Sequence, residues 1–283
     1  TSVLQLGQGF QFSGASSATM GMLLLCNPEG LQGMTVDDYK TIYWWEWIHR
    51  TWGRLIGVAF LLPFLWFWVK GRIEPALMPR LVFMLFLGGL QGGIGWWMVK
   101  SGLVDEPDVS QYRLAVHLTM AFIIQAVVFW TALDLWRGTF KSGQPVALKP
   151  LGLSALVLFV VVTGAFVAGT DAGYIYNTFP LMGGQVVPEA YWSLPGGLVN
   201  LVENPAAIQF NHRLVALLTF GLIVAYTVSV LRNPQSRTQK RAALAFVHMV
   251  VLQVALGIST LMVMGPAWLE TDYYIAFGAA HQG

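Results

Sequence analysis

The sequence predicts an all-α polytopic membrane protein made of two repeat-related helical bundles, because of its composition, its apolar runs and an internal repeat. Of its 283 residues, 55% are hydrophobic and only 11% are charged. About a quarter of a typical soluble chain is charged, so lipid is the solvent that suits this one. The formal net charge of +2 gives no sign of a nucleic-acid partner. The single cysteine, Cys26, excludes an internal disulfide and a cysteine-based zinc or iron–sulfur site.

Six segments are apolar over the length of about 20 residues that a helix needs to cross a bilayer. Charged residues, glycine or proline bound each of them. The spans are expected at residues 43–69, 81–99, 113–136, 151–169, 208–231 and 242–264. The tail from Tyr274 resembles the start of a seventh span cut off after His281, and residues 1–30 contain only one short apolar run. We therefore expect a chain that is truncated or processed at its ends.

The connections between the spans separate by charge. One set, residues 70–80, 137–149 and 232–241, carries the cations Lys70, Arg72, Arg80, Arg137, Lys141, Lys149, Arg232, Arg237, Lys240 and Arg241. The opposite set carries Asp105, Glu106, Asp108, Asp171, Glu189, Glu203, Glu270 and Asp272. The positive-inside rule puts the basic set in the cytoplasm or the mitochondrial matrix. The acidic set then marks the outer face.

Pairs of similar residues recur at a nearly constant offset. His49-Arg50 matches His212-Arg213 at 163 residues, and Leu90-Gln91 matches Leu252-Gln253 at 162. Tyr112 matches Tyr274 at 162, and His117 matches His281 at 164. These matches predict two structural repeats, and an even number of helices in each gives both the same orientation in the membrane.

The repeat places four histidines, His49, His117, His212 and His281, in one layer near the outer surface, one pair from each repeat. A single histidine in a membrane helix is often a buried hydrogen-bonding group, but four at matched depth favour a functional role. His248 lies near the basic end of its span with no repeat partner, which indicates a structural role.

Two histidines on facing helices can hold zinc, copper or iron. A zinc or di-iron site would need carboxylates or thiolates nearby, and only Glu46 is available; haem needs only axial ligands and space for its ring. Glycines could provide that space: Gly53, Gly57, Gly92, Gly93, Gly95, Gly221 and Gly257. Arg50, Arg54 and Arg213 could pair with haem propionates, although interfacial anchoring is the simpler role for an arginine.

Glu46 precedes His49 by three residues, so both project from one helix face, and its repeat equivalent is the neutral Gln209. Placing a carboxylate beside a metal site within the bilayer costs free energy, so its presence indicates a function. Proton transfer and covalent capture of a cationic intermediate are both sensible roles. The alternative is a salt bridge to Arg50 or Arg113.

At these residues the chain resembles the haem A synthase family, in its mitochondrial and proteobacterial branch, over about residues 33–283. The resemblance is carried by the segments Glu46–Gly57, Leu90–Leu103, Val109–Leu118, Gly164–Gly173, Glu203–Arg213 and Leu252–Thr260.

The resemblance implies eight helices in two halves, and oxidation of the C8 methyl of haem O to a formyl group, in oxygen-dependent steps, for cytochrome c oxidase. It implies that His49 and His117 flank the substrate haem, that Glu46 is the catalytic carboxylate, and that His212 and His281 ligate a resident haem b. Arg50, Arg54, Arg113 and Arg213 are the candidate propionate contacts.

The resulting domain division is an N-terminal segment at 1–40, a first half at 41–150 with the substrate haem site, and a second half at 151–283 with the haem b site, truncated at its last helix. The expected partners are the lipid bilayer, molecular oxygen, haem O synthase as upstream supplier and a ferredoxin-type electron donor, with no nucleic acid. The expected location is the mitochondrial inner membrane or the bacterial plasma membrane. Two other hypotheses remain open: a passive bis-histidine cytochrome b and a non-catalytic haem chaperone or assembly factor.

Overall fold

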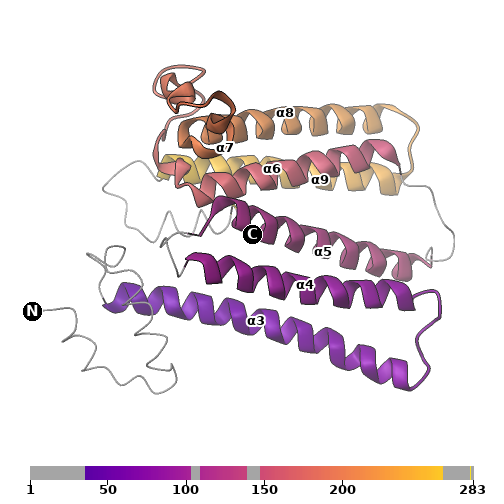
Figure 1. Ribbon diagram of the computed structural model, residues 1–283. Helices are drawn as coiled ribbons and strands as arrows, with labels where there is room; N and C mark the ends of the chain where they lie inside the picture. Colours follow the sequence, from indigo (N-terminus) through magenta and orange to yellow (C-terminus); the bar gives the residue numbers. More distant parts are fainter. Residues whose placement is uncertain (1–35, 103–108, 139–146, 264–280, 282–283) are drawn as a thin grey trace, which may run out of the picture. The chain divides into compact units, whose positions relative to one another are not determined.

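The computed structural model describes residues 36–102, 109–138, 147–263 and 281, and within these residues the chain is helical with no strands. The long helices are α3 (Val36–Val69), α4 (Met78–Gly102), α5 (Gln111–Arg137), α6 (Leu148–Gly169), α8 (Pro205–Arg232) and α9 (Arg237–Val263) (Figure 1). Between α6 and α8 lie three short 3₁₀ helices, η1 (Ala172–Tyr174), η2 (Glu189–Trp192) and η3 (Gly197–Val199), and the one-turn helix α7 (Asn200–Glu203).

All six predicted spans are confirmed. Each long helix has the length and hydropathy of a membrane span, from Tyr43–Val69 in α3 to Arg237–Val263 in α9. Only 6–17% of the residues in the most apolar stretch of each span are buried, so most of these side chains need an apolar solvent. The protein is therefore a multi-pass membrane protein. The head, residues 1–35, and the tail, residues 264–280 and 282–283, lie outside the described residues.

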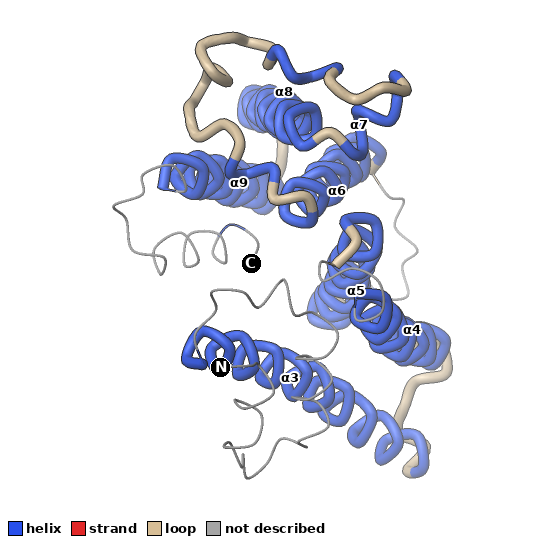
Figure 2. Tube along the Cα trace, turned by 60° about the vertical axis from the view of Figure 1, so that its left-hand side comes forward, coloured by secondary structure: helices blue, strands red, loops and turns tan. Residues whose placement is uncertain are grey.

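The helices group into two compact units. Residues 1–113 and 123–143 form the first, and residues 114–122 and 144–283 form the second, so α5 contributes to both. In the first unit α3 contacts α4, and Arg80 of α4 forms a 2.8 Å ion pair with Asp134 of α5. In the second unit α8 packs against both α6 and α9 (Figure 2).

In the second unit, residues 170–204 form a folded cap on the start of α8, as Figure 2 shows. Its core contains the buried side chains of Ala172, Met182 and Asn200, against the buried first turn of α8 at Ala206–Gln209. The connection is on the acidic side, so the cap lies at the end of α8 where the sequence places the histidine layer.

Asn204 joins the cap to α8. Its side-chain oxygen accepts the N–H of Ala206 at 3.0 Å, which is the N-cap bond, and Pro205 supplies the first helical residue. Its amide nitrogen lies 2.6 Å from the carbonyl oxygen of Ala190 in η2 and 2.8 Å from Oδ1 of Asn200, and the side chain is buried. Asn204 therefore fixes the first turn of α8 to the cap.

Replacing Asn204 with alanine should lower the free energy of unfolding by about 2–4 kcal/mol, because it removes a helix cap and leaves buried carbonyls unsatisfied. Thermal unfolding in detergent measures the effect. The matched control is Asn233→Ala: Asn233 follows the other end of α8, is exposed and donates to Ser229. Equal losses for both variants would contradict this role of Asn204.

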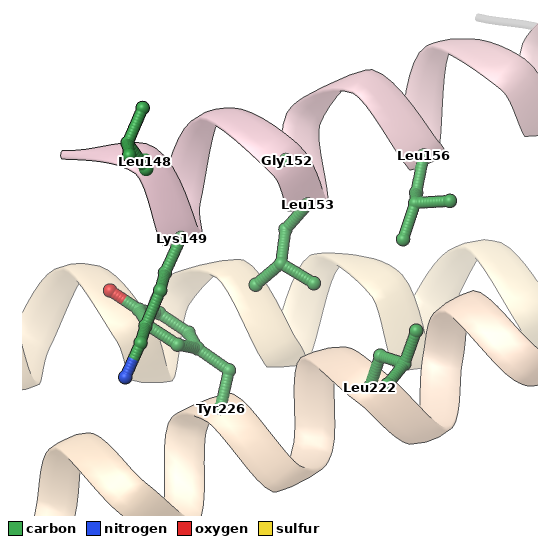
Figure 3. Close-up of a pocket in the computed structure, with 7 residues that line it drawn as sticks. All are labelled: Leu148, Lys149, Gly152, Leu153, Leu156, Leu222 and Tyr226. Atoms are coloured by element: carbon green, nitrogen blue, oxygen red, sulfur yellow. The ribbon is translucent and has the colours of Figure 1, made fainter. Parts of the chain in front are cut away.

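An apolar groove of about 350 Å³ lies between α6 and α8. Leu153 and Leu156 of α6 and Leu222 of α8 line it, with Lys149 and Tyr226 at one end (Figure 3). Lys149 belongs to the basic connections, so the groove opens at the opposite end of these helices from the cap. No histidine or carboxylate lines it, so it is not the candidate haem site.

Candidate functional site

His212 is held in the second unit by two adjacent residues of α6. Its Nδ1 lies 2.9 Å from Oγ1 of Thr163. A Cβ added to Gly164 would lie 3.2 Å from Cε1 of the same ring, so the imidazole packs directly against helix backbone. The half-buried ring of His212 therefore lies against α6 in a fixed orientation.

His281 has an equivalent glycine on α9. A Cβ on Gly257 would lie 2.7 Å from Cε1 of His281, closer than real Cβ atoms approach, and 3.1 Å from Nε2 of the same ring. Gln253, one turn earlier on α9, donates its side-chain N–H to the backbone carbonyl of His281. The buried Nδ1 of His281 has no hydrogen-bond partner among the described residues. A buried polar atom without a partner is costly unless a ligand satisfies it.

His212 and His281 both belong to the second unit. Each lies on a glycine of a neighbouring helix, and one has an unsatisfied buried nitrogen. No group of three or more histidine, cysteine or acidic side chains that could hold a metal ion occurs among the described residues. Two imidazoles without further ligands suit haem iron better than zinc, so these residues fit haem.

The cap fastens α8 on both sides of His212. Gln209, three residues before His212, donates to the backbone carbonyl of Tyr176 at 3.0 Å. Arg213, the residue after His212, donates to the same carbonyl at 2.6 Å and to the backbone carbonyl of Thr178 at 2.8 Å. Directly before His212, Asn211 accepts from the hydroxyl of Tyr191 at 2.9 Å. These bonds fix the rotation of α8 and hence the direction of the histidine side chain.

The cap also reaches α9, because Asn177 donates to the carbonyl of Leu261 at 3.2 Å. The same loop therefore holds the helices that carry His212 and Gly257. Arg213 was expected to contact a propionate, but both of its terminal nitrogens donate to cap carbonyls in this structure.

On α3, Glu46 and Arg50 form a 2.8 Å ion pair, and both side chains are at least half exposed. The salt bridge named as the alternative for Glu46 is therefore present. His49 and Arg54 on the same helix are exposed. An exposed ion pair contributes little to the stability of a protein. The ion pair with Arg50 is therefore too weak to explain by itself why residue 46 is a carboxylate.

On α5, Arg113 lies 4.7 Å from the centre of the Trp97 ring and donates to the carbonyl of Trp97 at 3.4 Å. His117 follows one turn later and is half-buried. Arg113 is thus stacked on α4 rather than paired with Glu46, the other salt bridge considered for it. Whether His49 and His117 form a pair stays a prediction.

Three of the histidines lie at matched positions in their helices. His49 is six residues after the start of its span at Tyr43, His117 six after Gln111, and His212 seven after Pro205. At 1.5 Å per residue each lies about 10 Å along its span. His248 differs: it lies eleven residues after Arg237 on the basic side, is exposed, and its Nδ1 contacts the carbonyl of Leu244 at 2.6 Å.

The family COX15-CtaA, described as "Cytochrome oxidase assembly protein", matches residues 26–272. The chain belongs to this family. The match contains His49, His117 and His212, and it confirms the resemblance inferred from the motifs.

Bacterial relatives are similar over most of the chain. A protein of Rhodospirillum centenum named Heme A synthase is 45% identical over 256 residues, which is 89% of this chain and 66% of the relative. Proteins of the same name from Sinorhizobium medicae and Paramagnetospirillum magneticum are 44% and 46% identical, over 89% and 85% of this chain and 67% and 69% of their own lengths. The chain thus spans about two thirds of the length of these relatives.

Sequence patterns alone missed two parts of the site. Thr163 was not singled out, because one hydroxyl in an apolar helix has no distinctive spacing. The fastening of α8 by the cap was missed because its bonds go to backbone carbonyls, which every sequence has. Two sequence signals could have indicated this fastening: the helix-start pair Asn204-Pro205, and the polar residues Gln209 and Arg213 in the first turns of an otherwise apolar span.

Proposed function

We propose that this protein is a haem A synthase-like membrane oxidoreductase, which converts the C8 methyl of haem O into a formyl group for cytochrome c oxidase. The observation that carries the proposal is the seating of His212 and His281 against Gly164 and Gly257, in a chain similar to proteins named Heme A synthase. Two half-buried imidazoles, each packed against a glycine of a neighbouring helix, support a haem site, because haem iron needs only axial ligands from the protein.

In this proposal His212 and His281 ligate a resident haem b, and His49 and His117 flank the haem O substrate. When bound, haem supplies one-electron and oxygen chemistry. The protein's own groups orient the ring, exclude water and move protons. Glu46 lies one turn before His49 on the same face of α3 and is the carboxylate proposed to accept or donate the proton there.

The arginines differ in what they can do for the haem. Arg50 and Arg54 on α3 are exposed near His49 and remain candidates for propionate contacts, although Arg50 would exchange its exposed ion pair with Glu46 for the propionate. Arg113 and Arg213 already make contacts to Trp97 and to the cap, so each would have to share its guanidinium with a propionate. We therefore expect α3 to supply the stronger contacts.

The proposed partners follow from the reaction. Replacing two hydrogens of a methyl group by one oxygen needs molecular oxygen and an electron donor, here proposed as a ferredoxin-type protein. Haem O synthase would supply the substrate. The proposed location is a bacterial plasma membrane or a mitochondrial inner membrane, with the histidine layer near the outer face, since the basic connections mark the inner one.

Mass analysis of the pigments extracted from the purified protein tests the function. The protein is produced in a host that makes haem O. A synthase should carry haem B together with haem O, its hydroxylated intermediate or haem A. Haem B alone would favour a passive cytochrome, and an absence of all haem would contradict both.

Replacing Gly257 with alanine should lower the haem B content of the purified protein severalfold. The new methyl group would displace the ring of His281, which lies 2.7 Å from the Cβ position. Gly152→Ala is the matched control, because Gly152 lies in α6 at the opposite end from the cap and a Cβ there meets nothing within 4 Å. It should retain haem and gain up to about 1 kcal/mol of helix stability. A haem content unaffected by Gly257→Ala would contradict the seating of His281.

A further inference from the structure

The hydroxyl of Thr163 makes two contacts of equal length. Oγ1 lies 2.9 Å from the backbone carbonyl of Val160 and 2.9 Å from Nδ1 of His212. A hydroxyl has one proton to donate and can accept through its lone pairs. The carbonyl of Val160 can only accept, whereas Nδ1 can donate, so both contacts are hydrogen bonds only if the hydroxyl proton goes to Val160. The oxygen of Thr163 is then left to accept a hydrogen bond from His212.

An acceptor opposite Nδ1 fixes the tautomer of the ring. Nδ1 must carry the proton, and in the neutral imidazole the other nitrogen, Nε2, is then unprotonated with its lone pair exposed. We propose that Thr163 is a positioning residue that holds His212 in this tautomer and so presents Nε2 as a ligand to iron. The inference deepens the proposed function, since it rests on His212 being a haem b ligand.

Gly164 contributes the second constraint on the same ring. It follows Thr163 on α6, and a Cβ at its position would lie 3.2 Å from Cε1, the carbon between the two nitrogens. One residue thus fixes which nitrogen is protonated, and the next fixes where the ring lies. The fastening of Gln209 and Arg213 to the cap holds the backbone of His212 from the other side.

The hydroxyl of Thr163 also bears on the redox chemistry that haem would have at this site. Nδ1 of His212, the nitrogen other than the proposed iron ligand Nε2, contacts this hydroxyl. A hydrogen bond from the outer nitrogen makes an imidazole a more basic ligand. A more basic ligand favours ferric over ferrous iron. Thr163, acting through His212, should therefore lower the reduction potential of haem b.

The test compares Thr163→Val, which keeps the shape and removes the hydroxyl, with Thr163→Ser, which keeps the hydroxyl. Thr131→Val is the matched control: Thr131 is buried in α5 and donates to the carbonyl of Val127 at 2.9 Å. Thr163→Val should weaken haem binding by about 10-fold or more and move the midpoint potential to a more positive value. Thr163→Ser should restore both, and Thr131→Val should resemble the unmodified protein.

Unchanged haem affinity and midpoint potential in Thr163→Val would overturn the inference. So would a loss of thermal stability in Thr163→Val with no spectral or redox change, since that indicates a purely structural hydroxyl. A change in Thr163→Val that Thr163→Ser fails to reverse would also overturn it.

Nitrogen-15 NMR of the haem-free protein with labelled histidine separates this inference from the proposed function, because it reports which ring nitrogen carries the proton. We expect a protonated Nδ1 on His212 that becomes a tautomer mixture in Thr163→Val. If the spectra show this change but the protein never binds haem, the role of Thr163 in setting the tautomer is supported and the proposed function is overturned. A proton on Nε2 of His212 would overturn the inference alone.

Discussion

Replacing Glu46 with glutamine should reduce the conversion of haem O to haem A by about 10²–10⁴-fold, the usual contribution of a general acid or base. Glutamine keeps the size of the side chain and removes its proton-transfer capacity. The absorption spectrum of the bound haem should remain, because no proposed iron ligand changes. Chromatography of extracted haems, alongside optical spectra of the same samples, measures both effects.

Glu74→Gln is the control for the loss of a carboxylate, since Glu74 is exposed in the connection between α3 and α4 on the basic side. It should leave product yield unchanged. The ion pair between Glu46 and Arg50 gives the competing explanation. If Glu46→Gln makes haem A at the normal rate, Glu46 is only a partner for Arg50, and the passive cytochrome becomes the better account of the protein.

Replacing His212 with alanine should remove haem b altogether, with an affinity loss of more than about 100-fold, since a direct ligand matters more than the partners that orient it. The low-spin spectrum of a bis-histidine haem should disappear. The cavity left by the ring lies against Thr163 and Gly164, so added imidazole should enter it and restore part of the spectrum.

His248→Ala is the matched control, because it removes a histidine from the same unit. His248 is exposed on α9, and its Nδ1 contacts the backbone carbonyl of Leu244. It should retain the haem content of the unmodified protein. Equal haem loss in both variants would indicate general destabilisation, and unchanged haem in His212→Ala would exclude His212 as a ligand.

The spans and their histidines could be predicted because the bilayer imposes a strong constraint. A lipid-exposed segment must satisfy its own backbone hydrogen bonds, so an apolar run of sufficient length has to be a helix. The histidine positions followed from the match of His49-Arg50 with His212-Arg213. The helices that bear these pairs are α3 and α8, and the matched Leu-Gln pairs lie on the next helices, α4 and α9.

The contacts made by the polar side chains could not be predicted in the same way. The guanidinium of Arg213 is the kind of group that binds a propionate. It instead donates to the cap, because the backbone carbonyls of Tyr176 and Thr178 lie within its reach. Gln209 shows the same effect, since it is the neutral counterpart of Glu46 and yet bonds the cap. The partners of these side chains depend on how the 35 residues of the cap fold, and the periodicity of the sequence does not predict the conformation of such a loop.

The central claim is that paired imidazoles from different helices hold haem iron in this protein. Electron–nuclear double resonance on protein labelled with nitrogen-15 histidine tests it most directly, because it detects the ligand nitrogens themselves. The account predicts two histidine nitrogens coupled to one low-spin ferric iron, with one coupling lost in His212→Ala. A bound haem without histidine coupling, or with both couplings intact in His212→Ala, would contradict it.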